Sequence, residues 1–390
     1  MSQRITGRYV SISTTGDVAE AYVPAPLPLN PPLQINADLH QSMIQAALEL
    51  GRLDSLTASL PDRPLFLYFF VRKEAVLSSQ IEGTQSSLSD LLMFENELTP
   101  GVPLEDVREV SRYVNALEYG LMRLREGFPL SLRLIREMHA RLMVQEQGVK
   151  PIPSEFRRVQ NWIGGTRPGN ARYVPPPPEY LIEAMGALEK FVHDEPERTP
   201  TLVKTALIHA QFESIHPFLD GNGRTGRLLI PLMLCAENIL SEPLLYISLF
   251  FKTYREEYYN RLQAIRTHGD WEGWVAFFIE GIRATAAETV AVAKALATLQ
   301  AVDRNKIRAL GRTAGTVLRV YDSLAKHIAI TIPKTAVETD LNFNTVKVSL
   351  RRLSELQIAK EITGHSRNKV FIYSAYAKLM DSGFEKSASF

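Results

Sequence analysis

The sequence has a single cysteine, Cys235, so no disulfide can form within the chain. This argues against a disulfide-stabilised secreted scaffold and leads us to expect a reducing, cytoplasmic location. No run of 18 apolar residues occurs, and the first twenty residues lack the apolar core of a signal peptide. The net charge is only +1, so no overall field points to nucleic acid or to a membrane as the partner.

The chain is longer than a single hydrophobic core usually allows. Its 390 residues predict two or three domains, with the ordinary globular composition of 45% hydrophobic and 22% charged residues. We divide it into an N-terminal region (1–100), a central region (101–300) and a C-terminal region (301–390). Charge marks the last of these, because residues 303–373 hold 13 Lys or Arg and 6 Asp or Glu, a net +7.

Apolar residues recur at helical spacing through most of the chain, so the predicted fold is mainly α. We expect a short edge strand at Arg8–Ser13 and an extended, proline-rich connector at residues 24–32. Gly51 and Gly83 are expected to end the first two helices. The predicted helices span residues 38–50, 64–80, 88–98, 104–125, 131–144, 180–193, 202–214, 224–238, 250–266 and 271–299.

Residues 151–178 interrupt this helical pattern. The alternation from Arg158 to Ile163 predicts a strand, Gly164 and Gly165 a turn, and Ala171–Val174 a return strand. The prolines at 175–178 then end the pairing. We therefore expect a β-hairpin flap on an otherwise helical domain.

The most informative segment reads HPFLDGNGRTGR and runs from His216 to Arg227. Apolar residues at helical spacing precede and follow it, so it is predicted to be a loop whose glycines begin the second of two helices. Such a position offers an anion unpaired backbone N–H groups and the positive end of a helix dipole. Gly221 and Gly223 remove the side chains that would keep phosphates away.

Polar side chains complete this predicted phosphate site. Arg224 and Arg227 are neighbours on the helix surface and can both bind a polyphosphate. Asp220 supplies a hard oxygen ligand, and one carboxylate is enough for Mg²⁺ when substrate phosphates supply others. His216, with an imidazole pKa near ~6.5, can take a hydroxyl proton at neutral pH. Asn222 can donate to a phosphate oxygen.

This segment resembles the signature of the Fic family, His-x-Phe-x-(Asp/Glu)-Gly-Asn-Gly-Arg-x-x-Arg, with every specified position present. The resemblance extends to the flap at Trp162–Pro178 and to Arg72–Asp90, and covers residues 30–300. It implies a helical Fic catalytic core that transfers AMP from Mg·ATP to Ser, Thr or Tyr hydroxyls of target proteins. Modification of the protein itself is also expected.

The resemblance assigns a role to each motif position. It makes His216 the general base and Asp220 the Mg²⁺ ligand, and it places the target segment as an added strand on the flap, at Ile163, Gly164 and Gly165. Tyr258 and Tyr259 match a pair bordering the adenine, although aromatic core residues at helical spacing explain them equally well. The expected ATP-binding residues are Glu82, Gly221, Asn222, Gly223, Arg224, Thr225, Gly226, Arg227, Tyr258 and Tyr259.

A second motif lies upstream of this core. Residues Ser78 to Gly83, SSQIEG, resemble the family's inhibitory motif, (Ser/Thr)-x-x-x-Glu-(Gly/Asn). The resemblance implies that Glu82 pairs with Arg227, so that this arginine cannot bind the γ-phosphate of ATP. In some relatives the same glutamate assists removal of AMP, which is a further activity to expect here.

The C-terminal region resembles a winged helix. We expect helices at 317–327, 335–340 and 344–356, and a hairpin of residues 358–362 and 369–373. Lys347, Arg351 and Arg352 lie on the predicted recognition helix and Arg367 and Lys369 on the wing, where they would suit phosphate contacts. An interaction or dimer-packing module with a solvated basic face is an equal alternative.

Two further functions compete with AMP transfer. Phosphate transfer occurs in relatives with Lys at the position of Gly223 and without the second arginine, so Gly223 and Arg227 argue against it. The alternative from another class is a DNA-binding regulator whose Fic-like domain senses nucleotide, which the intact His216 disfavours. The expected partners are therefore target proteins, with nucleic acid or a second copy of the chain possible through the C-terminal region, and no membrane.

Overall fold

The structure is a computed structural model that describes residue 4 and residues 6–14, 17–59, 63–95, 101–144, 154–363 and 369–381. Two adjoining helices, α7 (Thr201–Ile215) and α8 (Asn222–Ala236), form its centre. In α7, every residue from Leu202 to Ile215 is buried. A helix buried on all sides must lie inside a layer of others. The pair packs against α2 (Arg63–Glu82), α4 (Leu104–Arg125), α5 (Leu132–Met143), α10 (Arg255–His268) and α11 (Trp271–Arg308).

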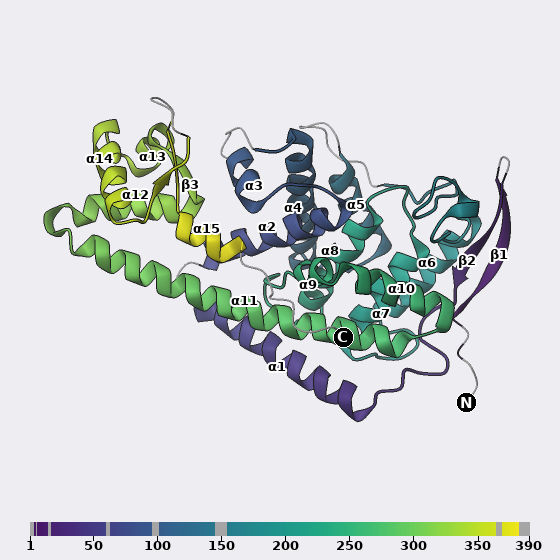
Figure 1. The fold of residues 1–390 in the computed structure, drawn as a ribbon. Helices are drawn as coiled ribbons and strands as arrows, with labels where there is room; N and C mark the ends of the chain where they lie inside the picture. Colours follow the sequence, from purple (N-terminus) through teal and green to yellow (C-terminus); the bar gives the residue numbers. More distant parts are fainter. Residues whose placement is uncertain are drawn as a thin grey trace.

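The predicted helices form, with several changes at their ends (Figure 1). The prediction for 104–125 is confirmed without change, but the single helix predicted for 250–266 is wrong. It is two helices, because the backbone leaves helical geometry at Tyr254 with ψ 42°. The remaining helices of this body are α2 (Arg63–Glu82), α3 (Leu88–Glu95), α4 (Leu104–Arg125), α5 (Leu132–Met143), α6 (Leu181–Val192), α9 (Ser248–Thr253) and α10 (Arg255–His268).

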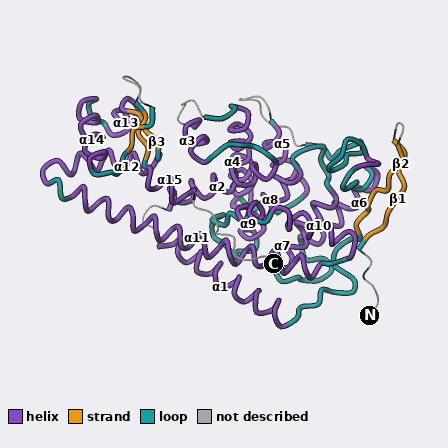
Figure 2. Tube along the Cα trace, in the orientation of Figure 1, coloured by secondary structure: helices purple, strands orange, loops and turns teal. Residues whose placement is uncertain are grey.

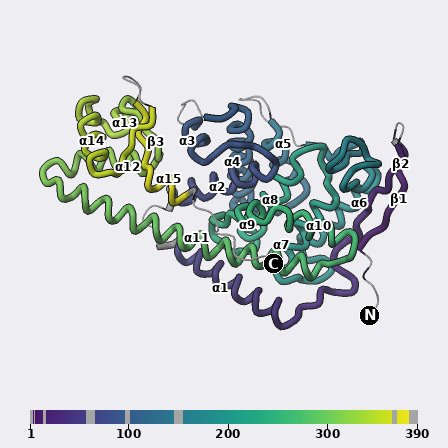
Figure 3. Tube along the Cα trace, viewed as in Figure 1, coloured from purple at the N-terminus to yellow at the C-terminus, as the bar shows by residue number. Residues whose placement is uncertain are grey.

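Two long helices lie side by side although they are far apart in the sequence (Figure 3). The first, α1 (Ala37–Ser59), does not end at Gly51 as predicted, because Leu53 is buried in the next turn. An internal glycine costs about 1 kcal/mol, which the burial of one leucine offsets. The second, α11 (Trp271–Arg308), passes the predicted end at Leu299, because Ile307 is buried and Asp303 accepts a hydrogen bond from Tyr373.

The strands lie at opposite ends of the molecule (Figure 2). At the N-terminal end, β1 (Gly7–Thr14) confirms the strand predicted at Arg8–Ser13. It pairs with β2 (Asp17–Pro24), a strand that was not predicted. The predicted flap hairpin is wrong in its regular pairing. A single antiparallel bridge joins Ile163 to Tyr173. Between these two residues in the sequence, Pro168–Asn170 form a 3₁₀ turn. The Val174 carbonyl instead accepts from Tyr22 on β2 at 2.9 Å.

The C-terminal unit follows α11 directly. It comprises α12 (Ala314–His327), β3 (Ala329–Thr331), α13 (Ile332–Thr339), α14 (Phe343–Glu355), β4 (Lys360–Glu361), β5 (Val370–Ile372) and α15 (Ser374–Asp381). The strand order is β3-β5-β4, and both pairs are antiparallel, so the predicted hairpin forms as β4 and β5. Strand β3 and helix α15 were not predicted, and Arg367 lies outside the described residues.

No helix in the described part of the chain is long and apolar enough to cross a membrane.

Candidate active site

The HPFLDGNGRTGR segment forms a tight loop between α7 and α8. His216 ends α7 in the left-handed conformation with φ 51°, and Gly221 begins α8 with φ 74°. Between them, the side-chain amide of Asn222 accepts from the Phe218 N–H and donates to the Phe218 carbonyl, both at 2.8 Å. The Asn222 side chain therefore closes the loop.

Residues outside the motif hold the loop from both sides. The His139 ring stacks on Phe218 with centroids 3.6 Å apart, and its Nε2 lies 2.9 Å from the Asp220 carbonyl. On the other side Arg157 donates to the His216 carbonyl at 2.9 Å, and Asn161 donates to Phe218 O at 3.0 Å. Four contacts of this kind on so short a segment fix its backbone, which is what a pre-formed anion site requires.

A cavity of about 610 Å³ opens over this loop. Its size falls within the usual range for small-molecule sites. It brings together most of the residues predicted from the sequence, since it is lined by Glu82, Gly83, Ile163, Gly164, His216, Asp220, Gly221, Asn222, Gly223, Arg224, Arg227, Tyr258 and Tyr259.

His216 is buried at the cavity as an uncharged imidazole. Its Nδ1 is buried and has no hydrogen-bond partner among the described residues. Burial lowers the pKa of His216, and the Arg266 and Arg157 guanidiniums lower it further. The imidazole is therefore neutral and can accept a proton.

Arg227 is held by the residues of the upstream motif. It is 1% exposed, and its Nη2 lies 2.6 Å from Glu82 Oε1. Its Nε donates to Ser78 Oγ at 2.9 Å, and Nη2 also donates to the Ser78 carbonyl at 3.0 Å. Burial opposes ionisation of the Glu82 carboxyl, but the Arg227 charge outweighs it and lowers the pKa of Glu82.

The C-terminal end of α2 explains this geometry. Ser78 and Glu82 are four residues apart and so project from the same face of the helix, and Gly83, with φ 114°, ends α2 directly after the glutamate. Gly223 makes room for the pair, because a Cβ there would collide with Glu82 Oε1 and lie 3.0 Å from Arg227 Nη1.

The other motif arginine also has an acidic partner. Arg224 Nη1 lies 2.8 Å from Glu109 Oε1 on α4, and Nη2 lies 3.6 Å from Asp220 Oδ2. Glu109 and Asp106 both line the cavity. The side chain of Asp220 is 73% exposed, so its carboxylate is accessible at the cavity.

Residues 40–122 match the Fic/DOC family N-terminal model, and residues 129–234, which contain the loop, match the Fic/DOC family model. This chain contains a Fic domain. Among curated proteins it is similar to "Protein adenylyltransferase Fic" of Drosophila erecta, 29% identical over 258 residues, covering 63% of this chain and 48% of that protein. The protein of the same name in Drosophila grimshawi is 31% identical over 204 residues, 51% of this chain and 39% of the relative. The chain thus spans less than half the length of these relatives.

Solved structures agree on the fold of the Fic domain and its surroundings. A Fic family protein from Desulfovibrio desulfuricans G20 superposes with a TM-score of 0.55 at 18% identity, covering 88% of this chain and 97% of that one. Fic-1 of C. elegans, residues 134–508, superposes with a TM-score of 0.51 at 22% identity, covering 66% of this chain and 74% of that one.

Some of the residues predicted to bind ATP make hydrogen bonds within the Fic domain. Thr225 is buried, and its hydroxyl donates to the Gly221 carbonyl at 2.8 Å. The Gly226 carbonyl is 3.0 Å from His209 Nδ1, whose Nε2 is 3.0 Å from the Tyr258 hydroxyl. Tyr258 is therefore a buried core residue that also lines the cavity. Gly165 is not among the cavity residues, although Ile163 and Gly164 are.

Other cavity residues were missed by the sequence analysis. They are Thr84, Asp106, Glu109, Trp162, Glu213 and Leu219. Glu213 had a usable signal, because it lies three residues before His216 and so one helical turn away from it. Glu109 and Asp106 had none, since nothing in the sequence relates α4 to the loop.

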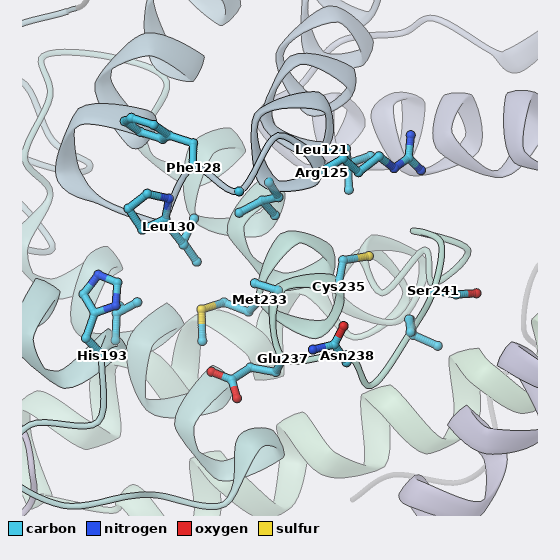
Figure 4. Close-up of a pocket in the computed structure, with 16 residues that line it drawn as sticks. Leu121, Arg125, Phe128, Leu130, His193, Met233, Cys235, Glu237, Asn238 and Ser241 are labelled. Carbon is cyan, nitrogen blue, oxygen red and sulfur yellow. The ribbon is translucent and has the colours of Figure 1, made fainter.

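A second cavity, of about 470 Å³, lies at the opposite end of α8 (Figure 4). Cys235, Glu237 and His193 contribute to it together with apolar residues such as Met233 and Leu121. None of the motif residues line this cavity, and burial raises the pKa of the Cys235 thiol to about 12. A neutral thiol is a weak nucleophile, so Cys235 is not suited to nucleophilic chemistry at neutral pH.

Proposed function

We propose that this protein is an adenylyltransferase that moves AMP from ATP onto hydroxyl groups of target proteins. The observation that carries the proposal is one cavity that holds a neutral histidine, two arginines and a glycine-rich helix N-terminus. The name of the curated relatives supports the same activity. Mechanistically, a base, an anion site and bound phosphates are what nucleotidyl transfer to a hydroxyl requires.

The chemistry follows from the position of each group. His216 takes the proton of the target hydroxyl as its oxygen bonds to the α-phosphorus of ATP. The bond from the α-phosphorus to the bridging oxygen breaks, and pyrophosphate leaves. Backbone N–H groups at Gly221–Gly223 stabilise the charge on the phosphates, Arg224 binds the β-phosphate region, and Arg227 binds the γ-phosphate.

Asp220 fits a magnesium ion. It is the exposed carboxylate of the loop, and its carbonyl is fixed by His139. The described residues contain no cluster of three or more metal-binding side chains, which suits an ion that takes most other ligands from phosphates and water. When bound, Mg²⁺ would neutralise charge on the departing pyrophosphate.

Glu82 inhibits this reaction in the proposed mechanism. An arginine already paired with a carboxylate cannot also bind the γ-phosphate in a geometry suited to in-line attack. Because the Glu82 side chain is 37% exposed beside the cavity, it is also placed to activate a water for removal of AMP from a modified target.

The flap binds the target, which can be the protein itself. The Ile163 N–H donates to the Tyr173 carbonyl at 2.8 Å, and this bridge holds Ile163 and Gly164 at the cavity. A target segment added there would bring a Ser, Thr or Tyr hydroxyl over the cavity.

The C-terminal unit has an exposed helix face suited to a partner. Asn344, Lys347 and Arg351 are exposed on α14, and with the antiparallel sheet they give a winged-helix-like arrangement. We retain duplex nucleic acid as a candidate partner, with a second copy of the chain as the alternative. Binding to random duplex DNA across a salt series distinguishes them, because phosphate contacts weaken steeply with salt.

The proposed function is tested by incubating the protein with ATP labelled on its α-phosphate, alone and with a lysate. Transfer of label to protein supports it. Transfer only from ATP labelled on the γ-phosphate would replace it with a phosphotransferase.

A further inference from the structure

Glu213 is a buried acid in the last turn of α7 that the mechanism above does not use. Its residue is 7% exposed, and it lines the cavity together with His216 and Arg227. Its Oε1 has no hydrogen-bond partner among the described residues. Buried polar atoms are rarely left unpaired. This carboxyl is therefore suited to accept a hydrogen bond from a side chain that comes within reach when the site rearranges.

Arg227, on α8, lines the same cavity as this carboxyl. Gly226, its neighbour in the sequence, packs so closely on Glu213 that a Cβ there would collide with Oε1. The positive charge of Arg227 acts to lower the pKa of Glu213, and the Glu213 carboxyl acts to raise the pKa of Arg227. In this structure the Arg227 guanidinium donates hydrogen bonds to Ser78 and Glu82.

We propose that Glu213 is a positioning residue that holds the Arg227 guanidinium in place for the γ-phosphate once Glu82 has left it. This inference rests on the proposed function, because it presupposes that binding of the γ-phosphate in a geometry suited to attack requires the Glu82–Arg227 pair to open. The Arg227 guanidinium then exchanges the Glu82 carboxylate for that of Glu213 and keeps its orientation.

The charges around Glu213 support this exchange. Burial and the Glu82 charge raise the pKa of Glu213 to about 7, while Arg227 and Arg266 oppose the rise. His216, the next titratable group on α7, stays neutral because its pKa is lowered. Departure of Glu82 removes the negative neighbour and frees the charge of Arg227, so Glu213 ionises when its partner becomes available.

Glu74 provides a matched control. It is also a fully buried carboxyl with a pKa raised to about 7, and it too is within the field of Arg227. Its oxygens, however, accept from the backbone and the hydroxyl of Ser248, and it is not a cavity residue. Glu74→Gln therefore removes a buried acid of the same kind without removing the proposed partner of the opened Arg227.

The experiment compares affinities for ATP and ADP by calorimetry in the Glu82→Gly protein, alone and combined with Glu213→Gln or Glu74→Gln. ADP lacks the γ-phosphate, so the ratio of the two affinities reports on Arg227. We expect Glu213→Gln to reduce the preference for ATP at least fivefold and leave ADP affinity within twofold, with Glu74→Gln having no such effect. An unchanged preference, or an equal loss with Glu74→Gln, would overturn the inference.

A second measurement avoids substituting Glu213 at all. In the Glu82→Gly protein, which lacks the charge that helps to raise the pKa of Glu213, the preference for ATP should fall as the pH is lowered below 7. The fall should be larger than in Glu82→Gly/Arg227→Ala, in which only the titration of the nucleotide itself remains. Equal profiles overturn the role of Glu213. If Glu82→Gly increases neither the preference for ATP nor AMP transfer over wild type, the result contradicts the inhibitory role of Glu82, on which the role of Glu213 depends.

Discussion

Arg227 Nη2 lies 2.6 Å from Glu82 Oε1, although the two residues are 145 positions apart in the sequence. The arginine side chain is 1% exposed and the glutamate side chain 37%. A fully buried guanidinium thus has its counter-charge on a group that solvent can reach. Such a pair can open without unburying the arginine, and this asymmetry makes Glu82 the movable partner.

Replacing His216 by Ala should abolish transfer and leave ATP binding largely intact. The imidazole acts on the incoming hydroxyl, whereas the phosphates are bound by the loop and the two arginines. Loss of a general base typically lowers the rate ~10²–10⁴-fold. The measurement is α-phosphate transfer beside ATP affinity, and near wild-type transfer by the variant would remove His216 from the mechanism.

Asp220→Ala should abolish both activity and its stimulation by Mg²⁺, because charge on the leaving pyrophosphate loses its metal partner. Asp220→Asn is the matched control, which keeps the shape and removes the charge, and it should be nearly as impaired. A magnesium titration of transfer checks this. Strong metal-stimulated activity in either variant would place the metal ligand elsewhere.

Ile163→Pro should impair modification of protein targets while leaving ATP affinity within about twofold. Proline removes the N–H that donates to the Tyr173 carbonyl and prevents regular strand addition. Ile163→Ala retains that N–H and should be much less affected. The flap assignment is wrong if the proline variant loses ATP binding and keeps target modification.

The sequence located the two segments that form the site better than the residues that surround them. The loop from His216 to Arg227 and the Ser78–Gly83 motif are local patterns, and both meet at one cavity. Glu109, His139 and Arg157 act across tertiary contacts between segments distant in sequence. No periodicity or spacing relates such residues to the loop before the chain folds.

The fold shows the same division. Amphipathic spacing located the helices, but their ends depended on packing, as Leu53 extends α1 past Gly51 and Ile307 extends α11. The flap was predicted as a hairpin from alternation alone. Its backbone instead pairs once with itself at Ile163 and then with β2 through Val174, a competition that the local sequence does not contain.

Inhibition by Glu82 should weaken as pH rises from 6 to 8. The pKa of Glu82 is lowered, so this carboxyl stays ionised throughout, whereas Glu213 has a pKa raised to about 7 while the pair is closed. Opening the pair lowers the Glu213 pKa, so the open form binds fewer protons and higher pH favours it. One proton changes the equilibrium by at most about tenfold per pH unit.

The measurement is the ratio of transfer rates of Glu82→Gly and wild type at each pH. We expect this ratio to shrink several-fold towards pH 8, within the limit of about tenfold per unit that one proton sets. With Glu213→Gln in both proteins the ratio should stay constant. A ratio that grows with pH would contradict the assignment of the proton to Glu213.

The most direct test of the central claim is α-phosphate transfer, self-modification included, by wild type, Glu82→Gly, Arg227→Ala and the double variant. If Glu82 inhibits by occupying Arg227, then Glu82→Gly should raise transfer by about 100-fold or more, as expected for freeing a charge-assisted phosphate contact shielded from water. Arg227→Ala in the same protein should erase most of that gain, because the two effects act through one interaction. A folded Glu82→Gly protein that binds ATP and shows no increase on any substrate, or a gain that survives Arg227→Ala, would contradict the account.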